Sequence, residues 1–183
     1  MSVELSSSFS SEDWQELKDS QDKAQIITVL RHRYSERYFE PFKKNESKHG
    51  FSMMAVSCLV IESLISLKRG WKKTNKPGKV IFEEFFSTSQ HLTDFTGLGA
   101  DFYKHIRCGI LHQAETTGGW RIRRDCSLPL VCADTKVIHA TKFLNQLEKE
   151  FENFLTELDK QEFTSPQWSK VVKKIDHIVT NCG

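Results

Sequence analysis

The chain has 183 residues, which is enough for one domain with a substantial core. Apolar residues make up 38% and charged residues 27%, a balance typical of soluble globular proteins. The net charge of +2 excludes a strongly basic nucleic-acid-binding protein, so any basic surface must be local.

The five cysteines form no CxxC motif and are odd in number, which indicates free thiols in a reducing compartment. They are Cys58, Cys108, Cys126, Cys132 and Cys182. The first residues do not combine a basic region with an apolar core, so we expect no secretory signal. The longest apolar stretch, residues 51–67, is interrupted by serines and a glutamate, which argues against a membrane span. We therefore expect a cytoplasmic protein.

The N-terminal part of the chain predicts a flexible end followed by two helices. Residues 1–10 are rich in serine, and we expect them to be flexible. The run Ser10-Ser-Glu-Asp13 resembles a capping box, which predicts a helix beginning near Ser11. Apolar residues at helical spacing predict a second helix over residues 23–39, and we expect Pro41 to end it.

The central part of the chain predicts the core of the fold. Residues 51–68 are apolar around most of the circumference of a helix, so we expect this helix to lie at the centre of a bundle. We expect Gly70 to end the helix. A basic loop leads to a short apolar helix over residues 80–86. A further helix is predicted over residues 100–113.

The C-terminal part predicts a small β-hairpin and two helices. Alternation over residues 120–124 and the apolar run 128–132 predict the two strands of the hairpin. Asp134 resembles an N-cap for a long helix that ends near Asp159, and Ser165-Pro166 predicts the start of a last helix. We therefore predict a mainly α fold, with six or seven helices and a hairpin in one domain over residues 11–183.

Arg107 and His112 are the candidate catalytic pair. A guanidinium holds phosphate oxygens at any working pH, and a histidine exchanges a proton near pH 7. On a regular helix the two side chains are about 140° apart and about 7.5 Å apart along the axis, so they need a bend or a second chain to converge. Gly109 would let another helix approach, as in a symmetric dimer. Alternatively, Arg107 pairs with Glu62 inside the chain and His112 caps the helix end.

The segment FYKHIRCGILHQAE, residues 102–115, resembles the signature of HEPN domains (higher eukaryotes and prokaryotes nucleotide-binding). Their motif is an arginine, four to six residues and a histidine near the end of a core helix. The stretch FSMMAVSCLVIESLISL, residues 51–67, looks like the other central helix of that family. Many HEPN proteins are metal-independent endoribonucleases that act as homodimers, and they occur as toxins paired with antitoxin proteins and in antiviral defence.

The resemblance implies a role for each motif residue. Arg107 would bind the scissile phosphate, and His112 would act as general acid or base in attack by the RNA 2′-hydroxyl. We expect supporting roles for neighbours of the pair: Glu62, Tyr103, Cys108, Gly109 and Gln113. Active members often carry a stronger polar group where this chain has Cys108. The alternative is a non-catalytic module of the same kind that binds RNA, a nucleotide or a partner protein.

Two basic groups are candidate contacts for RNA phosphates. Arg121, Arg123 and Arg124 follow the motif on the predicted hairpin, and Lys72 and Lys73 lie in the basic loop. The alternative is a solvated loop and a charged strand edge that prevents sheet aggregation.

A metal site is a weaker hypothesis. His105, Cys108 and His112 recur at i, i+3 and i+7 and are zinc-ligand types, with Cys126 or Cys132 as a possible fourth ligand. A polar seam on a packed helix has the same pattern. We therefore expect a protein that needs no metal or other cofactor.

Overall fold

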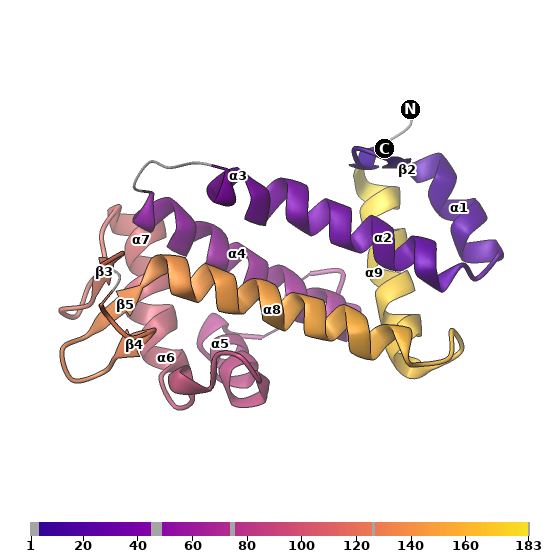
Figure 1. Cartoon of the computed structure of the whole chain (residues 1–183). Coiled ribbons are helices and arrows are strands. Elements are labelled where there is room, and N and C mark those ends of the chain that lie inside the picture. The colour runs from indigo at the N-terminus through magenta and orange to yellow at the C-terminus, as the bar shows by residue number, and fades with distance from the viewer. Residues whose placement is uncertain (1–3, 45–48, 74–75, 126, 183) are drawn as a thin grey trace. The chain divides into compact units, whose positions relative to one another are not determined.

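The computed structural model describes residues 4–44, 49–73, 76–125 and 127–182 and is mainly α-helical, as predicted (Figure 1). Two helices contain a π-helical segment, so several helical segments join end to end. Counted as continuous runs, and apart from the short 3-10 helix η2 (Thr93–Phe95), the helices of the described residues number seven: α1, α2-η1-α3, α4, α5, α6-η3-α7, α8 and α9.

The chain divides into two compact units. Unit 1 comprises Met1–Pro41, Ser66–Thr74 and Phe151–Gly183, and unit 2 comprises Phe42–Ile65 and Asn75–Glu150. The helices α4 (Gly50–Arg69) and α8 (Ala140–Asp159) contribute residues to both units. The interpretation of residues 11–183 as one domain stays a prediction.

Unit 1 begins with two short strands where the sequence predicts a flexible end. The strands β1 (Glu4–Ser6) and β2 (Phe9–Ser10) pair antiparallel, and Leu5 is buried. Burial of this leucine holds the segment against the protein, whereas its serine-rich composition predicts a flexible segment. Residues 1–3 of the expected flexible end lie outside the described residues.

The predicted capping box begins the first helix. The Ser10 hydroxyl accepts from the backbone of Asp13 (3.3 Å), and the Asp13 carboxylate accepts from the backbone of Ser10 (2.7 Å). The helix α1 accordingly spans Ser11–Asp19.

Pro41 does not end the second helix, contrary to the prediction. The helix α2 (Lys23–Tyr34) continues through the π-helical segment η1 (Ser35–Phe39) into α3 (Glu40–Lys43). In η1 the backbone N–H of Glu40 donates to the carbonyl of Ser35, five residues earlier. This wider turn gives the proline ring room that a regular α-helix denies it.

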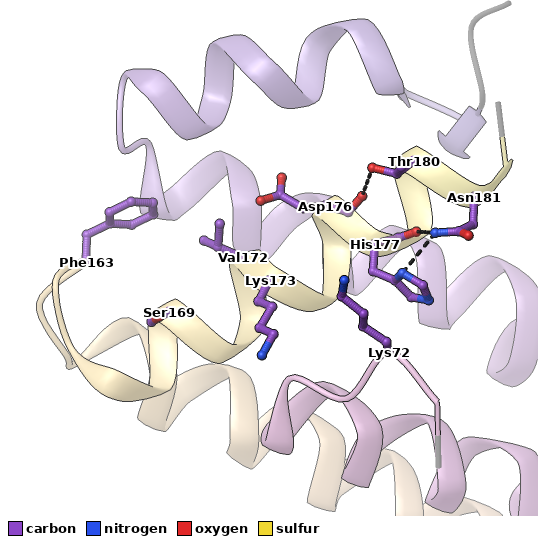
Figure 2. A pocket seen from close by; sticks show the side chains of 9 residues that line it. All are labelled: Lys72, Phe163, Ser169, Val172, Lys173, Asp176, His177, Thr180 and Asn181. Atoms are coloured by element: carbon purple, nitrogen blue, oxygen red, sulfur yellow. Dashed lines mark hydrogen bonds between the residues drawn. The ribbon is translucent and has the colours of Figure 1, made fainter. Parts of the chain in front are cut away.

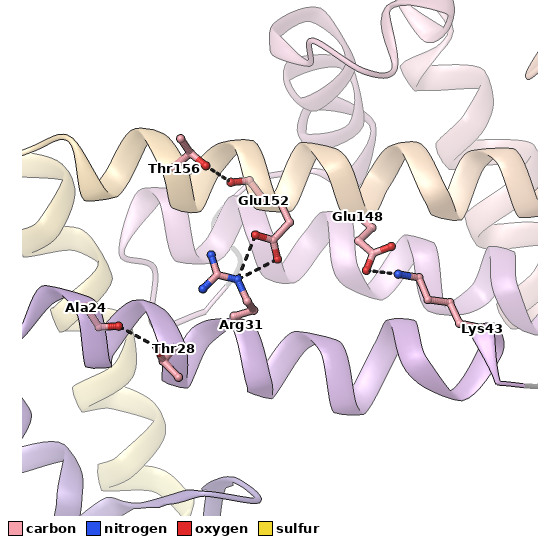
Figure 3. Close-up of polar contacts among 7 residues, drawn as sticks. All are labelled: Ala24, Thr28, Arg31, Lys43, Glu148, Glu152 and Thr156. Carbon is pink, nitrogen blue, oxygen red and sulfur yellow. Dashed lines mark hydrogen bonds and ion pairs between the residues drawn. The ribbon is translucent and has the colours of Figure 1, made fainter.

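Two ion pairs fix side chains of α8 (Figure 3). In unit 1, Nε of Arg31 donates to both carboxylate oxygens of Glu152, at 3.1 and 3.2 Å. In unit 2, Nζ of Lys43 lies 2.6 Å from the carboxylate of Glu148. Such pairs at the surface contribute up to about 1 kcal/mol each to stability.

The boundaries of two further helices follow the predicted signals. The helix α4 ends at Gly70, whose φ of +64° suits glycine, and Trp71 N–H donates to the Ser66 carbonyl. The helix α9 spans Pro166–Cys182, and the Ser165 hydroxyl accepts from the backbone N–H of Trp168 (3.3 Å).

Aromatic rings form the core of unit 2. The helix α5 (Gly78–Thr88) packs against α6 (Gly99–Asp101), and η2 (Thr93–Phe95) lies between them in the chain. Phe102 stacks on Phe143 with ring centroids 5.3 Å apart, and Phe95 meets the same ring edge-on at 5.0 Å. The same cluster also includes Phe82 and Phe86. This burial anchors the helix that carries Arg107.

The small hairpin is present, but its strands differ from the predicted ones. The strands are β3 (Arg121–Arg123), β4 (Val131–Cys132) and β5 (Val137–His139). Their order is β3-β5-β4, so β4 and β5 form the antiparallel hairpin and β3 pairs parallel with β5. The predicted pairing of residues 120–124 with 128–132 is therefore wrong. The predicted turn over residues 125–127 includes Cys126, which lies outside the described residues.

The long helix α8 begins at Ala140 and not near Asp134, although it ends at Asp159 as predicted. Asp134 lies in a turn closed by a hydrogen bond from Lys136 N–H to the Ala133 carbonyl. Three buried residues of β5 follow that turn. The β-branched side chains of Val137 and Ile138 favour the strand over an earlier helix start.

The helix α4 is the one helix in the described part of the chain that is long and apolar enough to cross a membrane. Most of its apolar side chains are buried inside the protein, as in the core helix of a soluble protein. This agrees with the expected soluble protein, while its cytoplasmic location stays a prediction.

Candidate functional site

The motif helix contains a π-helical segment directly before the candidate catalytic pair. It runs from α6 through η3 (Phe102–Arg107) into α7 (Cys108–Gln113). Since η3 ends at Arg107, the turns that join Arg107 to His112 are regular α-helix. The two side chains are therefore about 140° apart around the axis, and within one chain they point in different directions.

Arg107 pairs with Glu62 of α4, as one of the two sequence hypotheses expects. Its Nε donates to one carboxylate oxygen at 2.8 Å, and Nη2 lies 3.5 Å from the other. The two side chains are 22% and 23% exposed, so the pair is shielded but still reaches solvent. Within the described residues, Nη1 of Arg107 has no hydrogen-bond partner.

The charge of Glu62 outweighs the effect of burial on Arg107. Burial alone would lower the pKa of Arg107, but the hydrogen bond and charge of Glu62 raise it above its ordinary value. The guanidinium is therefore fixed in position and permanently charged. A fixed cation with one free edge is suited to hold an anion such as a phosphate oxygen.

Tyr103 and Cys108 surround the guanidinium on its own helix. The Arg107 guanidinium carbon lies 5.7 Å from the centroid of the Tyr103 ring. The π-helical turn brings Tyr103 and Cys108 together, and their hydrogen bond raises the pKa of Tyr103. The ring also covers Gly78, where a Cβ atom would lie 1.9 Å from it. Both residues are half-buried and lie beside the arginine.

Gly109 accommodates the chain's own return segment, contrary to the expected approach of a second helix. A Cβ atom there would lie 2.6 Å from the carbonyl oxygen of Glu115, and Gly109 is buried. The segment turns back because Ala114 adopts a left-handed conformation with φ 54°. A dimer contact through Gly109 is therefore excluded by residues 115–117.

His112 and Gln113 are exposed at the C-terminal end of the motif helix. Leu111 beside them is 46% exposed, and Leu59 on α4 is 47% exposed. Leu111 lies one turn after Arg107, and Leu59 lies one turn before Glu62. The ion pair is thus flanked by an exposed leucine on each helix.

His105 binds the loop that follows the helix through its Nδ1. Its Nδ1 lies 2.9 Å from the hydroxyl of Thr117, and its carbonyl accepts from the Thr117 backbone N–H at 3.0 Å. In the described ranges, no group of three His, Cys, Asp or Glu side chains is placed to hold a metal ion. Cys132 hydrogen-bonds with Thr135, which lowers the pKa of its thiol, and Cys126 lies outside those ranges.

The thiols that the structure describes are free, as expected for a reducing compartment. They are Cys58, Cys108 and Cys132. Burial, followed by the charge of Glu62, raises the pKa of the Cys58 thiol far above its ordinary value. The side chains of Cys126 and Cys182 are outside the described part of the chain.

The predicted arginines lie on β3, in the same unit as the motif helix. Arg121 and Arg123 are exposed, and Arg121 donates to the Thr135 carbonyl at 3.2 Å. Arg124 donates from Nε to the Thr141 hydroxyl at 2.9 Å. Arg123 and Arg124 line a hollow of about 250 Å³ with Gly50 and Phe51 of α4. Arg123 is therefore the arginine of this group that is both exposed and at the hollow.

The predicted lysines and these arginines belong to different units. Lys72 and Lys73 are exposed in the loop after α4 and belong to unit 1, whereas the motif helix and β3 belong to unit 2. Each basic group must therefore be tested separately.

His139 has a structural role at the start of α8 that the sequence did not predict. Its Nδ1 accepts from the backbone N–H of Lys142 at 3.2 Å, so it caps α8. It is 4% exposed, and this burial lowers its pKa below the ordinary value. Because histidine is not a common N-cap residue, its position before the helix gave little signal.

Comparison with known proteins gives no relative for this chain. No protein-family model matches it, and neither the curated proteins nor the solved structures provide a match. The resemblance to HEPN domains therefore stays a hypothesis that is carried by residues 102–115 and by the geometry of Arg107.

Proposed function

We propose that this protein is a metal-independent endoribonuclease of the HEPN type. Arg107 of one chain holds the scissile phosphate, and His112 of a second chain exchanges the proton in attack by the RNA 2′-hydroxyl. The family resemblance adds toxin or defence activity as a biological role, with an antitoxin protein as a partner.

The observation that carries this proposal is the state of Arg107. Glu62 holds Nε and Nη2 at 2.8 and 3.5 Å, while the side chain keeps 22% of its surface exposed. A guanidinium that is oriented before the substrate arrives stabilises developing phosphate charge without reorganisation. An arginine that served only to neutralise Glu62 would not need an exposed edge.

A homodimer is part of the proposal because one chain cannot bring the pair together. The regular α-helix between Arg107 and His112 directs them apart. The exposed Leu59 and Leu111 beside the ion pair supply apolar surface for a second copy. A two-fold axis through this surface would place the motif helices of two chains next to each other.

RNA contacts away from the cleavage site are assigned to β3. Arg121 and Arg123 are exposed and lie in the unit that holds the motif helix. Such arginines neutralise phosphates, so we expect RNA affinity to fall as the salt concentration rises.

A cleavage assay with purified protein tests the proposal. We expect the wild type to cut single-stranded RNA in the presence of EDTA, and Arg107→Ala and His112→Ala each to lower the rate by at least about a hundredfold. His91→Ala is the matched control, and its rate should equal that of the wild type. Unchanged cleavage by either motif variant would contradict the proposal.

A non-catalytic RNA-binding module is the second candidate. The ion pair with Glu62 favours it, because two of the three guanidinium nitrogens are already engaged. A weakly polar thiol at Cys108 also favours it. In that case the protein would bind RNA without cutting it, and Arg121→Ala with Arg123→Ala would abolish binding.

A further inference from the structure

A second hollow lies in unit 1, on the exposed face of α9 (Figure 2). Its volume is about 780 Å³, a size typical of small-molecule sites. Ser169, Lys173, His177 and Asn181 recur every four residues along α9 and line it. Lys72, from the loop after α4, lines the same hollow. None of the motif residues takes part, so an inference about this hollow does not rest on the proposed RNA cleavage.

The lining of this hollow carries an excess of positive charge. Lys72 and Lys173 are both exposed, and Asp176 is the acidic residue beside them. The Asp176 carboxylate accepts from the Trp14 indole at 2.8 Å and pairs with Lys18 at 3.2 Å. Since Lys18 already compensates Asp176, the two ammonium groups in the hollow favour an anionic ligand.

His177 adds a hydrogen-bond donor to the hollow. Nδ2 of Asn181 lies 2.9 Å from Nδ1 of His177 and 2.7 Å from its carbonyl oxygen. An amide nitrogen only donates, so Nδ1 accepts and the proton of the neutral ring is on Nε2. Nε2–H is then available to an oxygen of a bound ligand.

An aromatic ring closes one end of the hollow. Figure 2 shows Phe163 at one end and Asn181 at the other, with both lysines between them. The Phe163 ring lies against Trp168 with centroids 5.2 Å apart. Trp168 is buried and donates from its indole to the Leu158 carbonyl at 2.9 Å, which fixes Phe163. A fixed, partly exposed ring is a stacking surface for a planar group.

We propose that this hollow binds a nucleoside phosphate. The phosphate lies between Lys72 and Lys173 and accepts from Nε2 of His177, and the base stacks on Phe163. The ligand is either a free nucleotide or the phosphorylated end of an RNA strand, which share this chemistry.

Calorimetric titration of the full chain tests the proposal, with adenosine 5′-monophosphate as the free nucleotide. We expect it to bind more tightly than inorganic phosphate or adenosine alone. Lys72→Gln and Lys173→Gln should each weaken binding about tenfold, because each removes one charge-assisted hydrogen bond. Phe163→Leu should weaken binding of the nucleotide and leave that of inorganic phosphate unchanged.

Lys73→Gln is the matched control, since Lys73 is exposed beside Lys72 but does not line the hollow. It should bind the nucleotide like the wild type. A short RNA with and without a 5′-phosphate distinguishes the two sources. Phosphate-dependent binding of that RNA, with the same response to both lysine variants, would identify an RNA end as the ligand. The proposal is overturned if neither ligand binds, or if both lysine variants bind as the wild type does.

Discussion

The Arg107–Glu62 pair determines what the candidate site does at the scale of single residues. A shielded charge without its partner is destabilising, so each member of the pair constrains the other. Glu62 is a positioning residue in this account, because it contacts the arginine and not the substrate.

Glu62→Gln is therefore expected to affect both stability and cleavage. Loss of the charge should lower the free energy of unfolding by about 1 kcal/mol. It should also lower kcat roughly tenfold with little change in KM, because the guanidinium loses its fixed orientation. Chemical denaturation and steady-state kinetics measure the two effects.

Glu148→Gln provides the control for that prediction. Glu148 pairs with Lys43, whose side chain is 50% exposed. Glu148→Gln should therefore lower the free energy of unfolding by less than about 0.5 kcal/mol and leave kcat unchanged. Equal kcat values for Glu62→Gln and the wild type would show that cleavage does not need this orientation.

His139 is expected to make stability depend on pH. Its buried ring accepts from Lys142 N–H in the neutral form, and its pKa is lowered in the folded state. The stabilisation is therefore complete above the unfolded-state pKa of about 6.5 and is lost as the pH falls through that value toward the lower folded-state pKa. His139→Asn keeps an acceptor at the helix start but does not titrate.

Urea unfolding at about pH 7.5 and about pH 5.5 measures this difference. The wild type should lose more stability between the two values than His139→Asn does. The prediction fails if both proteins lose the same amount.

At this scale, the sequence was sufficient to propose the ion pair but not its surroundings. Glu62 interrupts an apolar helix, which indicates a buried carboxylate that needs a cation. The bond between His105 and Thr117, and the packing of Gly109 against Glu115, depend on how residues 114–119 turn back. The course of residues 114–119 depends on tertiary packing, which cannot be predicted from a local sequence pattern.

At the scale of elements, the motif helix is shaped by its π-helical segment and by its left-handed end. The segment η3 brings Tyr103 and Cys108 together beside Arg107, and the turn at Ala114 returns the chain over Gly109. The turn therefore uses a residue other than glycine in a conformation that costs energy.

Ala114→Gly is accordingly expected to stabilise the protein. Glycine adopts φ near 54° without a Cβ penalty, which should add about 0.5–1 kcal/mol and raise Tm by a few degrees. Gly118→Ala should do the opposite, because its φ is 62° and its Cβ would lie 2.5 Å from the His105 ring. Thermal unfolding compares them, and a lower Tm for Ala114→Gly would contradict this view of the turn.

Helix boundaries with a local chemical signal were predictable, and those decided by distant contacts were not. Ser10, Gly70 and Ser165 each act through neighbours within a few residues, and all three predictions are confirmed. The start of α8 was misplaced because β5 is held by strands that come earlier in the chain. The π-helical segments were missed because they share the apolar spacing of ordinary helices.

At the scale of the whole molecule, the proposed activity depends on association of two chains. Leu59 and Leu111 are exposed beside the ion pair, whereas most large apolar side chains of the described residues are buried. An exposed apolar surface beside a candidate site is a typical interaction surface.

Leu111→Glu is expected to abolish the dimer without unfolding the chain. Leu111 is 46% exposed, so a charge there costs little in the monomer and much in an apolar interface. Val80→Glu, at a residue that is 38% exposed on α5, is the control and should remain dimeric. Light scattering after size-exclusion chromatography gives the masses, and a dimeric Leu111→Glu would place the interface elsewhere.

Mixing two inactive variants tests the central claim most directly. Arg107→Ala and His112→Ala are unfolded, mixed in equal amounts and refolded together, and RNA cleavage is measured in EDTA. If Arg107 and His112 act from different chains, half of the dimers are mixed and each of these holds one complete site. The mixture should then recover about one quarter of the wild-type activity. Failure of the mixture to exceed either variant alone, while the refolded wild type is active, would contradict the account.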